Sequence, residues 1–322
     1  MQYTSLGNTG LKVSVAGIGC GGHSRIGLSS GKSAVESAAI IRQAVDLGVN
    51  FIDTAAAYGT EAIVGRAISE VKREEVVISS KASVCDLDGA LHPVEEVVAS
   101  LDQSLANLGI DCIDVFHLHG VPPRHYDYAT EMVVPALLRE RDKGKFSYLG
   151  ITEIPPHDPD HDMLLQMQSG DGDLFGVIMV AYHMLNQSAK DLVFPHALEQ
   201  GIGVLIMFAV RILFSEPGRL AREVNRLVDA GQLPATLRGE DPLGFLIHDG
   251  GAHSVIDAAY RYCRHTAGAD VILFGTGSAD HLRANVNSIL GPPLPAKDVE
   301  QLETLFAGLS GIGLDFADGH KK

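Results

Sequence analysis

SAVESAAIIRQAVDLGVNFIDT, residues 33–54, contains both patterns from which the fold is built. Ser33 and Glu36 have the spacing of a capping box, and the apolar residues after them recur at helical spacing as far as Gly48. Residues 51–54 then form a short run that begins with two consecutive apolar residues, as in a strand buried on both faces. The stretch predicts a helix that leads into a strand of a parallel sheet.

The same alternation recurs along the whole chain. Strands are expected at residues 15–19, 51–54, 76–81, 115–119, 148–152, 176–180, 203–208 and 271–275. After the helix that ends at Gly48, further helices are expected at 61–72, 94–107, 130–143, 188–200, 253–266, 280–290 and 297–309. Eight alternations favour a closed (β/α)8 TIM barrel of the α/β class over an open doubly wound sheet.

Three further features complete this expected architecture. Residues 3–14 read as an N-terminal β-hairpin that turns at residues 8–10 and closes the bottom of the barrel. The helix at 297–309 is an extra C-terminal helix outside the barrel, and residues 209–252 are expected to be an irregular insertion over the catalytic face. We expect residues 1–322 to form one domain.

Composition excludes several classes of function. A formal net charge of -15 and a pI near 5.3 argue against nucleic acid as a partner. The start of the chain lacks a basic segment followed by an apolar core, and no apolar run approaches the roughly 20 residues of a membrane span, so we expect a cytoplasmic protein without a membrane partner. The four cysteines form no CxxC pair, which predicts neither a metal site nor a disulfide framework.

Four polar residues lie at or just after the ends of neighbouring predicted strands: Asp53, Tyr58, Lys81 and His119. Each alone has an ordinary explanation, respectively a helix cap, loop packing, a solvated side chain and a satisfied core histidine. Together they bring an acid, a phenol, a cation and an imidazole to one end of one barrel, where the function of such barrels resides. This combination favours catalysis.

The chemistry that suits these groups is reduction of a carbonyl. A carbonyl that accepts hydride develops alkoxide charge and needs a proton donor. Tyrosine has a reference pKa of about 10, so a buried Lys81 ammonium beside Tyr58 is expected to favour the phenolate, while Asp53 keeps Lys81 charged. His119 then orients the substrate oxygen or relays the proton.

The segments around these residues resemble the aldo-keto reductase superfamily. The resemblance rests on GVNFIDTA (48–55), Tyr58-Gly59, Glu61, GRAI (65–68), ISSK (78–81), IDVFHLHG (113–120), LGIT (149–152), GIGV (201–204), FGTGS (274–278) and Asn285. It implies a barrel enzyme that interconverts a carbonyl and an alcohol with a nicotinamide dinucleotide, in which His119 rather than His117 completes the tetrad. It also implies cofactor contacts at Gly19, Cys20, Thr152, Glu153, Met179, Phe208, Gly275, Thr276, Gly277, Ser278, His281, Arg283 and Asn285.

Several of these positions depart from the family pattern. Thr152-Glu153 replaces the usual Ser-Asn pair, Met179 replaces a glutamine, and Phe208 lies in a run that replaces Tyr-Ser-Pro. The carboxamide is then held by Thr152 and Asn186, or turnover of the ordinary reaction is reduced. A third reading is a cofactor-sensing binding module with little turnover. Glu153 either faces the cofactor or is a solvated loop carboxylate.

The resemblance favours NADP(H), with NAD(H) as the alternative. Ser278 and His281 stand where the family often has Lys and Arg, which leaves Arg283 as the nearest full charge and predicts weak discrimination. The substrate is expected to be a small carbonyl or hydroxylated compound, and oxidation of a sugar or secondary alcohol remains an alternative direction. The loop at residues 120–128 either contributes to its pocket or is ordinary surface. We expect a monomer or a weak homo-oligomer.

Overall fold

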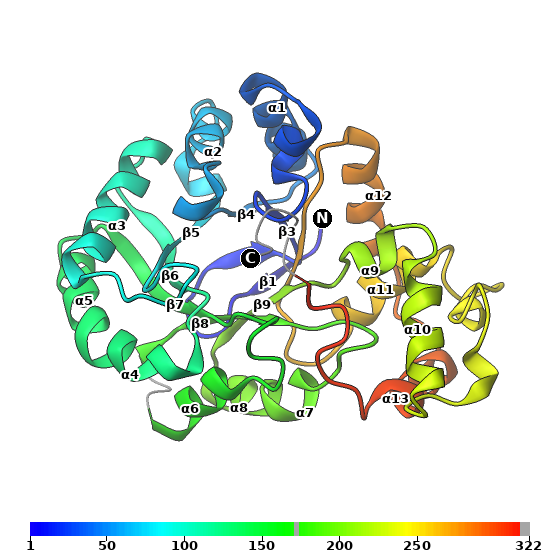
Figure 1. The fold of residues 1–322 in the computed structure, drawn as a ribbon. Helices are drawn as coiled ribbons and strands as arrows, with labels where there is room; N and C mark the ends of the chain where they lie inside the picture. Colours follow the sequence, from blue (N-terminus) through cyan, green and yellow to red (C-terminus); the bar gives the residue numbers. More distant parts are fainter. Residues whose placement is uncertain (171–173, 316–322) are drawn as a thin grey trace.

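The computed structural model describes residues 1–170 and 174–315 and shows a closed barrel of parallel strands surrounded by helices (Figure 1). Around the barrel the order is β10-β3-β4-β5-β6-β7-β8-β9. The strands are β3 (Ala16–Gly19), β4 (Phe51–Asp53), β5 (Val77–Ser83), β6 (Ile113–His119), β7 (Phe146–Thr152), β8 (Val177–Ala181), β9 (Gly203–Met207) and β10 (Val271–Phe274). The predicted TIM barrel and all eight of its strands are confirmed, with differences of one or two residues at their ends.

The N-terminal hairpin is also confirmed. β1 (Tyr3–Ser5) pairs antiparallel with β2 (Lys12–Ser14). Leu6 and Val13 from this hairpin are fully buried and pack with Phe51, Val115 and Leu205 from the barrel strands. The hairpin therefore fills the bottom of the barrel, which leaves the other end for polar side chains.

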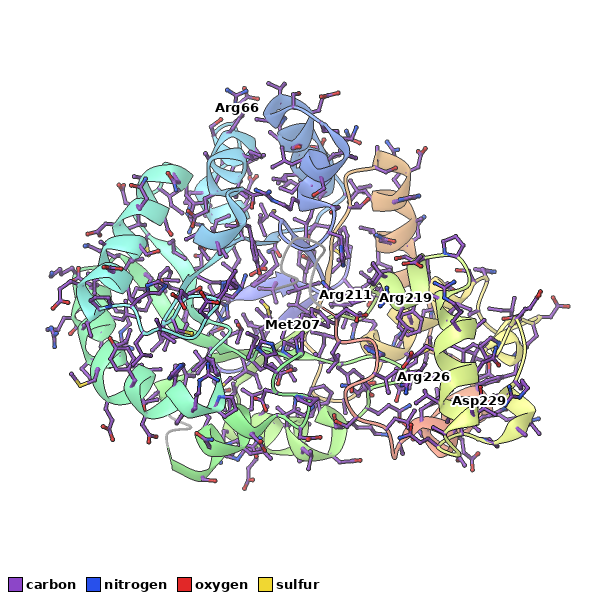
Figure 2. The ribbon with its side chains drawn as sticks, in the orientation of Figure 1. Arg66, Met207, Arg211, Arg219, Arg226 and Asp229 are labelled. Carbon is purple, nitrogen blue, oxygen red and sulfur yellow. The ribbon has the colours of Figure 1, made fainter. Side chains whose placement is uncertain are left out.

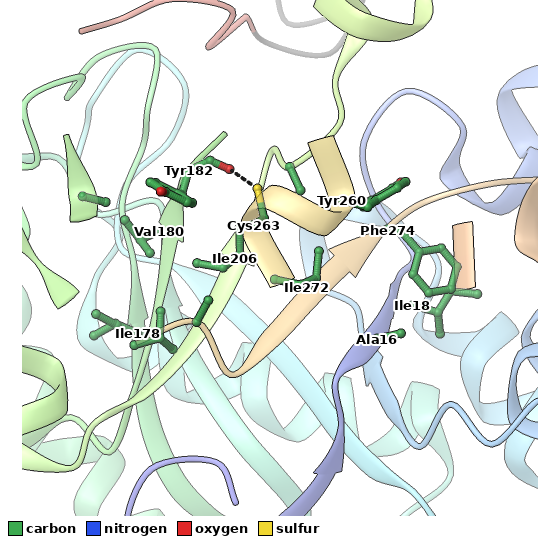
Figure 3. Packing of buried hydrophobic residues seen from close by; sticks show 14 of the residues in the cluster. Ala16, Ile18, Ile178, Val180, Tyr182, Ile206, Tyr260, Cys263, Ile272 and Phe274 are labelled. Carbon is green, nitrogen blue, oxygen red and sulfur yellow. Dashed lines mark hydrogen bonds between the residues drawn. The ribbon is translucent and has the colours of Figure 1, made fainter. Parts of the chain in front are cut away.

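A larger apolar layer lies between the strands and the helices. Because side chains alternate along each strand, residues between the inward ones point outward. Ile178, Val180, Ile206 and Ile272 do so, and Figure 3 shows them near Cys263. The Cys263 thiol donates a hydrogen bond to the Tyr182 carbonyl at 3.4 Å. The strands are thus buried on both faces, which explains their runs of consecutive apolar residues.

The outer helices follow the predicted alternation, with some shifts. They include α1 (Ala34–Asp46), α2 (Glu61–Ile68), α3 (Val94–Leu108), α5 (Val134–Asp142), α11 (Val255–Arg264), α12 (Ala279–Ile289) and α13 (Ala296–Phe306). The capping box at Ser33 and Glu36 is present at the start of α1. The helix expected at 188–200 is divided at Val193 into α7 (Ala189–Leu192) and α8 (Phe194–Gln200), the second with Pro195 in its first turn. α6 (Asp162–Gly170) was not predicted.

The prediction that residues 209–252 are irregular was wrong in part. They contain α9 (Ile212–Ser215) and α10 (Arg219–Asp229), and α10 buries Val224, Leu227 and Val228. These apolar residues have helical spacing, but they lie between Pro217-Gly218 and Gly231, which resemble loop sequence. The insertion stands on the side of the barrel formed by β9 and β10, across from β4, β5 and β6 (Figure 1).

Residues 307–315, here called the C-terminal strap, run from α13 back toward the centre of the barrel (Figure 1). The Gly311 amide donates to Asn186 Oδ1 at 2.9 Å, and His183 Nε2 donates to the Ile312 carbonyl at 3.0 Å. Asp315 accepts hydrogen bonds from Arg211 and Arg219. The strap thus joins the segments that follow β8 and β9. Over the ranges that the structure describes, no helix is long and apolar enough to cross a membrane.

Candidate active site

Asp53 and Lys81 form a buried ion pair at the ends of β4 and β5. Lys81 is fully buried, and its Nζ donates to Asp53 Oδ1 at 2.6 Å, to Asp53 Oδ2 at 2.7 Å and to the Thr54 carbonyl at 2.7 Å. Ser79 Oγ donates to Asp53 Oδ1 at 2.8 Å. All three ammonium donors therefore have acceptors, so Lys81 acts on its surroundings through its charge. Burial would lower the pKa of Lys81, but the Asp53 charge raises it above 10.5.

Tyr58 lies above this pair on the short 3-10 turn Ala56–Tyr58. Lys81 Nζ is 5.0 Å from the centre of the Tyr58 ring. The Tyr58 hydroxyl is 3.3 Å from His119 Nε2, and the two rings meet edge to face with centroids 5.3 Å apart. Arg25 Nε and Nη2 donate to the Tyr58 carbonyl at 3.1 Å and 2.6 Å. The four residues predicted from the strand ends are therefore in one place.

Two opposing effects act on the protonation of Tyr58. Burial raises the pKa of Tyr58 above 10, and the Lys81 charge lowers it, as the sequence suggested, but only in part. The phenol proton is therefore retained at neutral pH, which suits donation to an alkoxide.

His117 and His119 point into the barrel from the same strand, β6, but at different depths. His117 is fully buried, and neither of its ring nitrogens has a hydrogen-bond partner. Burial and the Lys81 charge lower the pKa of His117 well below 6.5, so this ring is neutral. A Cβ on Gly150 would lie 2.3 Å from His117 Nδ1, so only glycine fits beside the ring on β7. His119, not His117, reaches Tyr58.

Thr152 and Glu153 end β7 and are both buried. Thr152 Oγ1 accepts from the Gly120 amide at 2.7 Å. Glu153 Oε1 accepts from the Ala181 amide at 2.7 Å, while Glu153 Oε2 is 2.7 Å from His161 Nδ1. The expectation of a solvated Glu153 was therefore wrong: its carboxylate connects the loop after β7 to the end of β8.

The partner of Glu153 was not predicted from the sequence. His161 has a positive φ of 64°, and its Nε2 is 2.8 Å from Ser188 Oγ. Burial opposes a charge on His161, but the hydrogen bond and charge of Glu153 raise the pKa of His161 above 6.5. Burial also raises the pKa of Glu153 above 4.5. Glu153 and His161 form a buried pair, although no sequence motif links residues eight positions apart outside a helix.

The other positions expected to touch the carboxamide lie on β8 and β9. Met179 points into the barrel and packs with its apolar interior. Asn186 is fully buried, and its Nδ2 has no hydrogen-bond partner. Phe208 directly follows β9 with a φ of 70°, a conformation that is strained for a bulky residue. Asn186 Nδ2 is thus a buried donor that is available to a ligand.

Gly275, Thr276, Gly277 and Ser278 form the turn between β10 and α12. Thr276 Oγ1 accepts from the Ser278 amide at 3.0 Å, and Ser278 Oγ caps α12 by accepting from the His281 amide at 3.4 Å. A Cβ on Gly277 would lie 2.4 Å from the Gly27 Cα, so the turn packs tightly against the loop after β3.

Charged groups on this side of α12 lie at the surface. His281 and Arg283 are both exposed, and Arg283 Nη1 lies 3.6 Å from Asp280 Oδ1. Asn285 is partly exposed one turn further along the helix. Gly19 ends β3, and its carbonyl would lie 3.3 Å from a Cβ placed on Gly275.

Cys20 is fully buried next to Gly19. Its amide donates to the Asp53 carbonyl at 2.8 Å, and burial raises the pKa of the thiol far above 9.0. Cys20 is therefore an inert thiol that packs beside the ion pair. Within residues 1–170 and 174–315, no group of three or more His, Cys, Asp or Glu side chains could hold a metal ion.

Arg211 is a site residue that the sequence analysis missed. It follows β9, and Figure 2 shows it near Met207 and Arg219, toward the centre of the barrel. Its guanidinium carbon lies 3.9 Å from the centre of the Phe208 ring. No strand-end rule or motif identifies this position, because the residue lies at the start of the insertion.

Comparisons with known proteins identify the family of the chain. A family model described as Aldo/keto reductase family matches residues 18–306. L-galactose dehydrogenase of Arabidopsis thaliana is 30% identical over 211 residues, a match that covers 64% of this chain and 64% of that enzyme. Aldo-keto reductase YhdN of Bacillus subtilis (strain 168) is 27% identical over 331 residues, which cover 95% of this chain and 93% of YhdN.

Solved structures agree on the fold. The holo form of aldo-keto reductase AKR11C1 from Bacillus halodurans superposes with a TM-score of 0.71 at 22% identity and covers 100% of both chains. The thermostable aldo-keto reductase Tm1743 gives a TM-score of 0.69 at 19% identity and covers 94% of this chain and 99% of that one. With the family model spanning most of the sequence, the chain belongs to the aldo/keto reductase family, whose members are oxidoreductases that use nicotinamide cofactors.

Proposed function

We propose that this enzyme interconverts an aldehyde or ketone and the corresponding alcohol, with Tyr58 as the proton donor in reduction and the acceptor in oxidation. The observation that carries the proposal is the 3.3 Å approach of the Tyr58 hydroxyl to His119 directly above the buried Lys81 and Asp53 pair. The nicotinamide cofactor, when bound, supplies or accepts the hydride.

The residues of the chain then donate one proton and stabilise one negative charge. Tyr58 retains its proton at neutral pH and can donate it to the oxygen of the substrate as alkoxide charge develops. The fixed Lys81 charge beneath the ring stabilises the phenolate that remains. His119, at the other side of the hydroxyl, positions the substrate oxygen. A well-placed acid of this kind contributes roughly 10²- to 10⁴-fold in rate.

We propose that Thr152 and Asn186 hold the carboxamide of the cofactor. Supporting this, Asn186 Nδ2 is a buried donor without a partner, and the Thr152 hydroxyl accepts one hydrogen bond while its own proton is available. We extend the proposal to Gly19, Cys20, Met179 and Phe208, which lie on or directly after β3, β8 and β9. Glu153 would act only by fixing the backbone around Thr152, since its carboxylate binds Ala181 and His161.

We propose a weak preference for NADP(H) over NAD(H). Gly275, Thr276, Gly277 and Ser278 open α12, whose first amides can bind a phosphate, with His281, Arg283 and Asn285 on the first turns. Arg283 is the nearest full cation, and a neutral or exposed partner on the first turn cannot replace a bidentate guanidinium. The ratio of kcat/KM for NADPH over NADH should therefore lie between one and about 100. A ratio above about 100 in either direction would contradict this.

An alternative in the oxidative direction is a sugar or secondary-alcohol dehydrogenase. The similarity to L-galactose dehydrogenase favours it, since that enzyme is named for a sugar. A screen of carbonyls and polyols with both cofactors separates the two directions. Tight cofactor binding without turnover in that screen would instead support a cofactor-sensing module.

A cytoplasmic location is proposed from the four free cysteines, which suit a reducing compartment.

Tyr58→Phe tests the proposed role directly. The change removes the proton donor and little contact surface, so turnover should fall at least 10²-fold while the Kd of NADPH stays within about twofold. Tyr3→Phe is the matched control, because that residue lies in the N-terminal hairpin and its hydroxyl donates to the Gly48 carbonyl at 3.0 Å. More than about a tenth of the wild-type rate in Tyr58→Phe, in an assay limited by chemistry, would overturn the assignment.

A further inference from the structure

Arg211 is held in a strained segment at the mouth of the barrel. Phe208, three residues earlier, has a φ of 70°, and its ring lies 3.9 Å from the guanidinium carbon of Arg211. Arg211 Nη2 donates to the Asp315 carbonyl in the C-terminal strap. Backbone strain at a non-glycine residue is commonly kept where it serves a site. Here it brings an aromatic ring and a carbonyl to one arginine.

The guanidinium charge of Arg211 is not paired with a carboxylate in the part of the chain that the structure describes. In the described part of the chain, no Asp or Glu oxygen forms a salt bridge with Arg211, and the nearby Asp315 carboxylate binds Arg219 at 2.5 Å. Arg211 Nε is buried and makes no hydrogen bond. Burial lowers the pKa of Arg211 to about 10, which leaves it charged at neutral pH. The other titratable groups around it are His183, neutral because burial lowers its pKa to about 4, and Tyr58.

Arg211 is close to the proposed proton donor. A Cβ on Gly21 would lie 2.6 Å from the Tyr58 ring, and a Cβ on Gly22 would lie 3.9 Å from Arg211 Nη1. The phenol ring and the guanidinium therefore lie beside two consecutive residues of the loop after β3. Consecutive Cα atoms are about 3.8 Å apart and each Cβ is about 1.5 Å from its Cα, so the nearest atoms of the two groups are at most about 13 Å apart. A small molecule whose carbonyl lies on Tyr58 can reach Arg211 with its other end.

We propose that Arg211 binds a carboxylate of the substrate, so that the enzyme acts on oxo acids or hydroxy acids in preference to neutral analogues. This inference rests on the proposed carbonyl and alcohol chemistry at Tyr58. A single planar guanidinium with unused donors matches a singly charged carboxylate, which it can bind through two hydrogen bonds. The net charge of -15 disfavours anions at long range, so an anionic substrate needs such a local cation.

A pair of aldehydes of equal size tests the proposal. We expect kcat/KM with NADPH to be about 10- to 100-fold higher for 4-carboxybenzaldehyde than for neutral 4-carbamoylbenzaldehyde, as for a charge-assisted hydrogen bond. Arg211→Met should bring this ratio to about one, and Arg211→Lys should retain part of it. Circular dichroism establishes that both variants are folded.

Arg222→Met is the matched control. It removes the same charge from the same insertion, but Arg222 is exposed and pairs with Glu216 at 2.7 Å, so the ratio should remain that of the wild type. A wild-type ratio near one, or an unchanged ratio in Arg211→Met, overturns the inference while leaving the carbonyl chemistry intact. A tenfold rise in the Kd of NADPH in Arg211→Met with an unchanged ratio would show that Arg211 binds the dinucleotide instead. Absence of carbonyl turnover by the wild type would overturn both proposals.

Discussion

Replacement of Asp53 by Asn should separate the structural role of the buried ion pair from its catalytic role. The change keeps the shape of the side chain but removes its negative charge and one of its two acceptor oxygens. In the wild type both carboxylate oxygens accept hydrogen bonds from Lys81 Nζ, at 2.6 Å and 2.7 Å, and the carboxylate balances the charge of Lys81. Lys81 is fully buried, so no water can replace the lost partner. Breaking a buried pair on one side costs about 3–5 kcal/mol.

The size of this effect can be checked against the double variant. Asp53→Asn combined with Lys81→Met removes both charges and fills the lysine site with an apolar chain. Because desolvation then costs nothing, its free energy of unfolding should return to within about 2 kcal/mol of the wild type. Turnover should not return, since the double variant lacks the cation beneath Tyr58. Between the single and the double variant, stability should therefore recover while turnover stays low.

Urea unfolding followed by far-UV circular dichroism suits the measurement, because the chain contains no tryptophan. The pH gives a second check. The pKa of Lys81 is raised above 10.5 in the folded state, so the pair stabilises the protein below pH 10.5 and loses that contribution as the pH rises through the folded value. Only the wild type should show this alkaline loss. A cost below about 1 kcal/mol for Asp53→Asn, or a double variant no more stable than the single one, would refute the reasoning.

Two further predictions concern buried groups outside the tetrad. Burial lowers the pKa of His183 from 6.5 to about 4, so its folded form resists protonation and the protein loses about 1.4 kcal/mol per pH unit, about 3 kcal/mol in total, as the pH falls through that window. Acid unfolding of His183→Gln should lack this part of the slope, and an identical slope would contradict the assignment. Glu153→Gln should lower the free energy of unfolding by about 1–3 kcal/mol through the His161 contact while the Kd of NADPH stays within about twofold. A changed Kd with unchanged stability would instead mean that Glu153 faces the cofactor.

The barrel could be predicted because its strands are short, apolar and buried on both faces. That pattern is local in sequence, as are the capping box at Ser33 and the turn of the N-terminal hairpin. α10 was missed because Pro217 and Gly218 precede it and Gly231 follows it, although Val224, Leu227 and Val228 have helical spacing. α6 was missed because prolines surround its N-terminal cap in the sequence. The buried Asp158 side chain forms that cap by accepting hydrogen bonds from the Asp162 and Met163 amides.

The four residues proposed as the catalytic tetrad could be brought together for a similar reason. Asp53 and His119 end β4 and β6, Lys81 lies two residues before the end of β5 between them, and the carboxyl ends of parallel strands meet at one end of a barrel. The pKa of Tyr58 could not be predicted in the same way, because it depends on how deeply the ring is buried. Arg211 and the pairing of Glu153 with His161 depend on loop conformations with positive φ at Phe208 and His161. No periodicity in the sequence encodes such loops.

The separate origins of the tetrad and the insertion have a practical value for enzyme engineering. Proton chemistry would reside on β4, β5, β6 and the turn after β4, whereas Arg211 comes from one continuous segment beyond β9. A designer could therefore randomise residues 209–219 in a single cassette without altering any tetrad side chain or Phe208. Substrate selectivity would then change through this segment alone, while the tetrad residues stay the same.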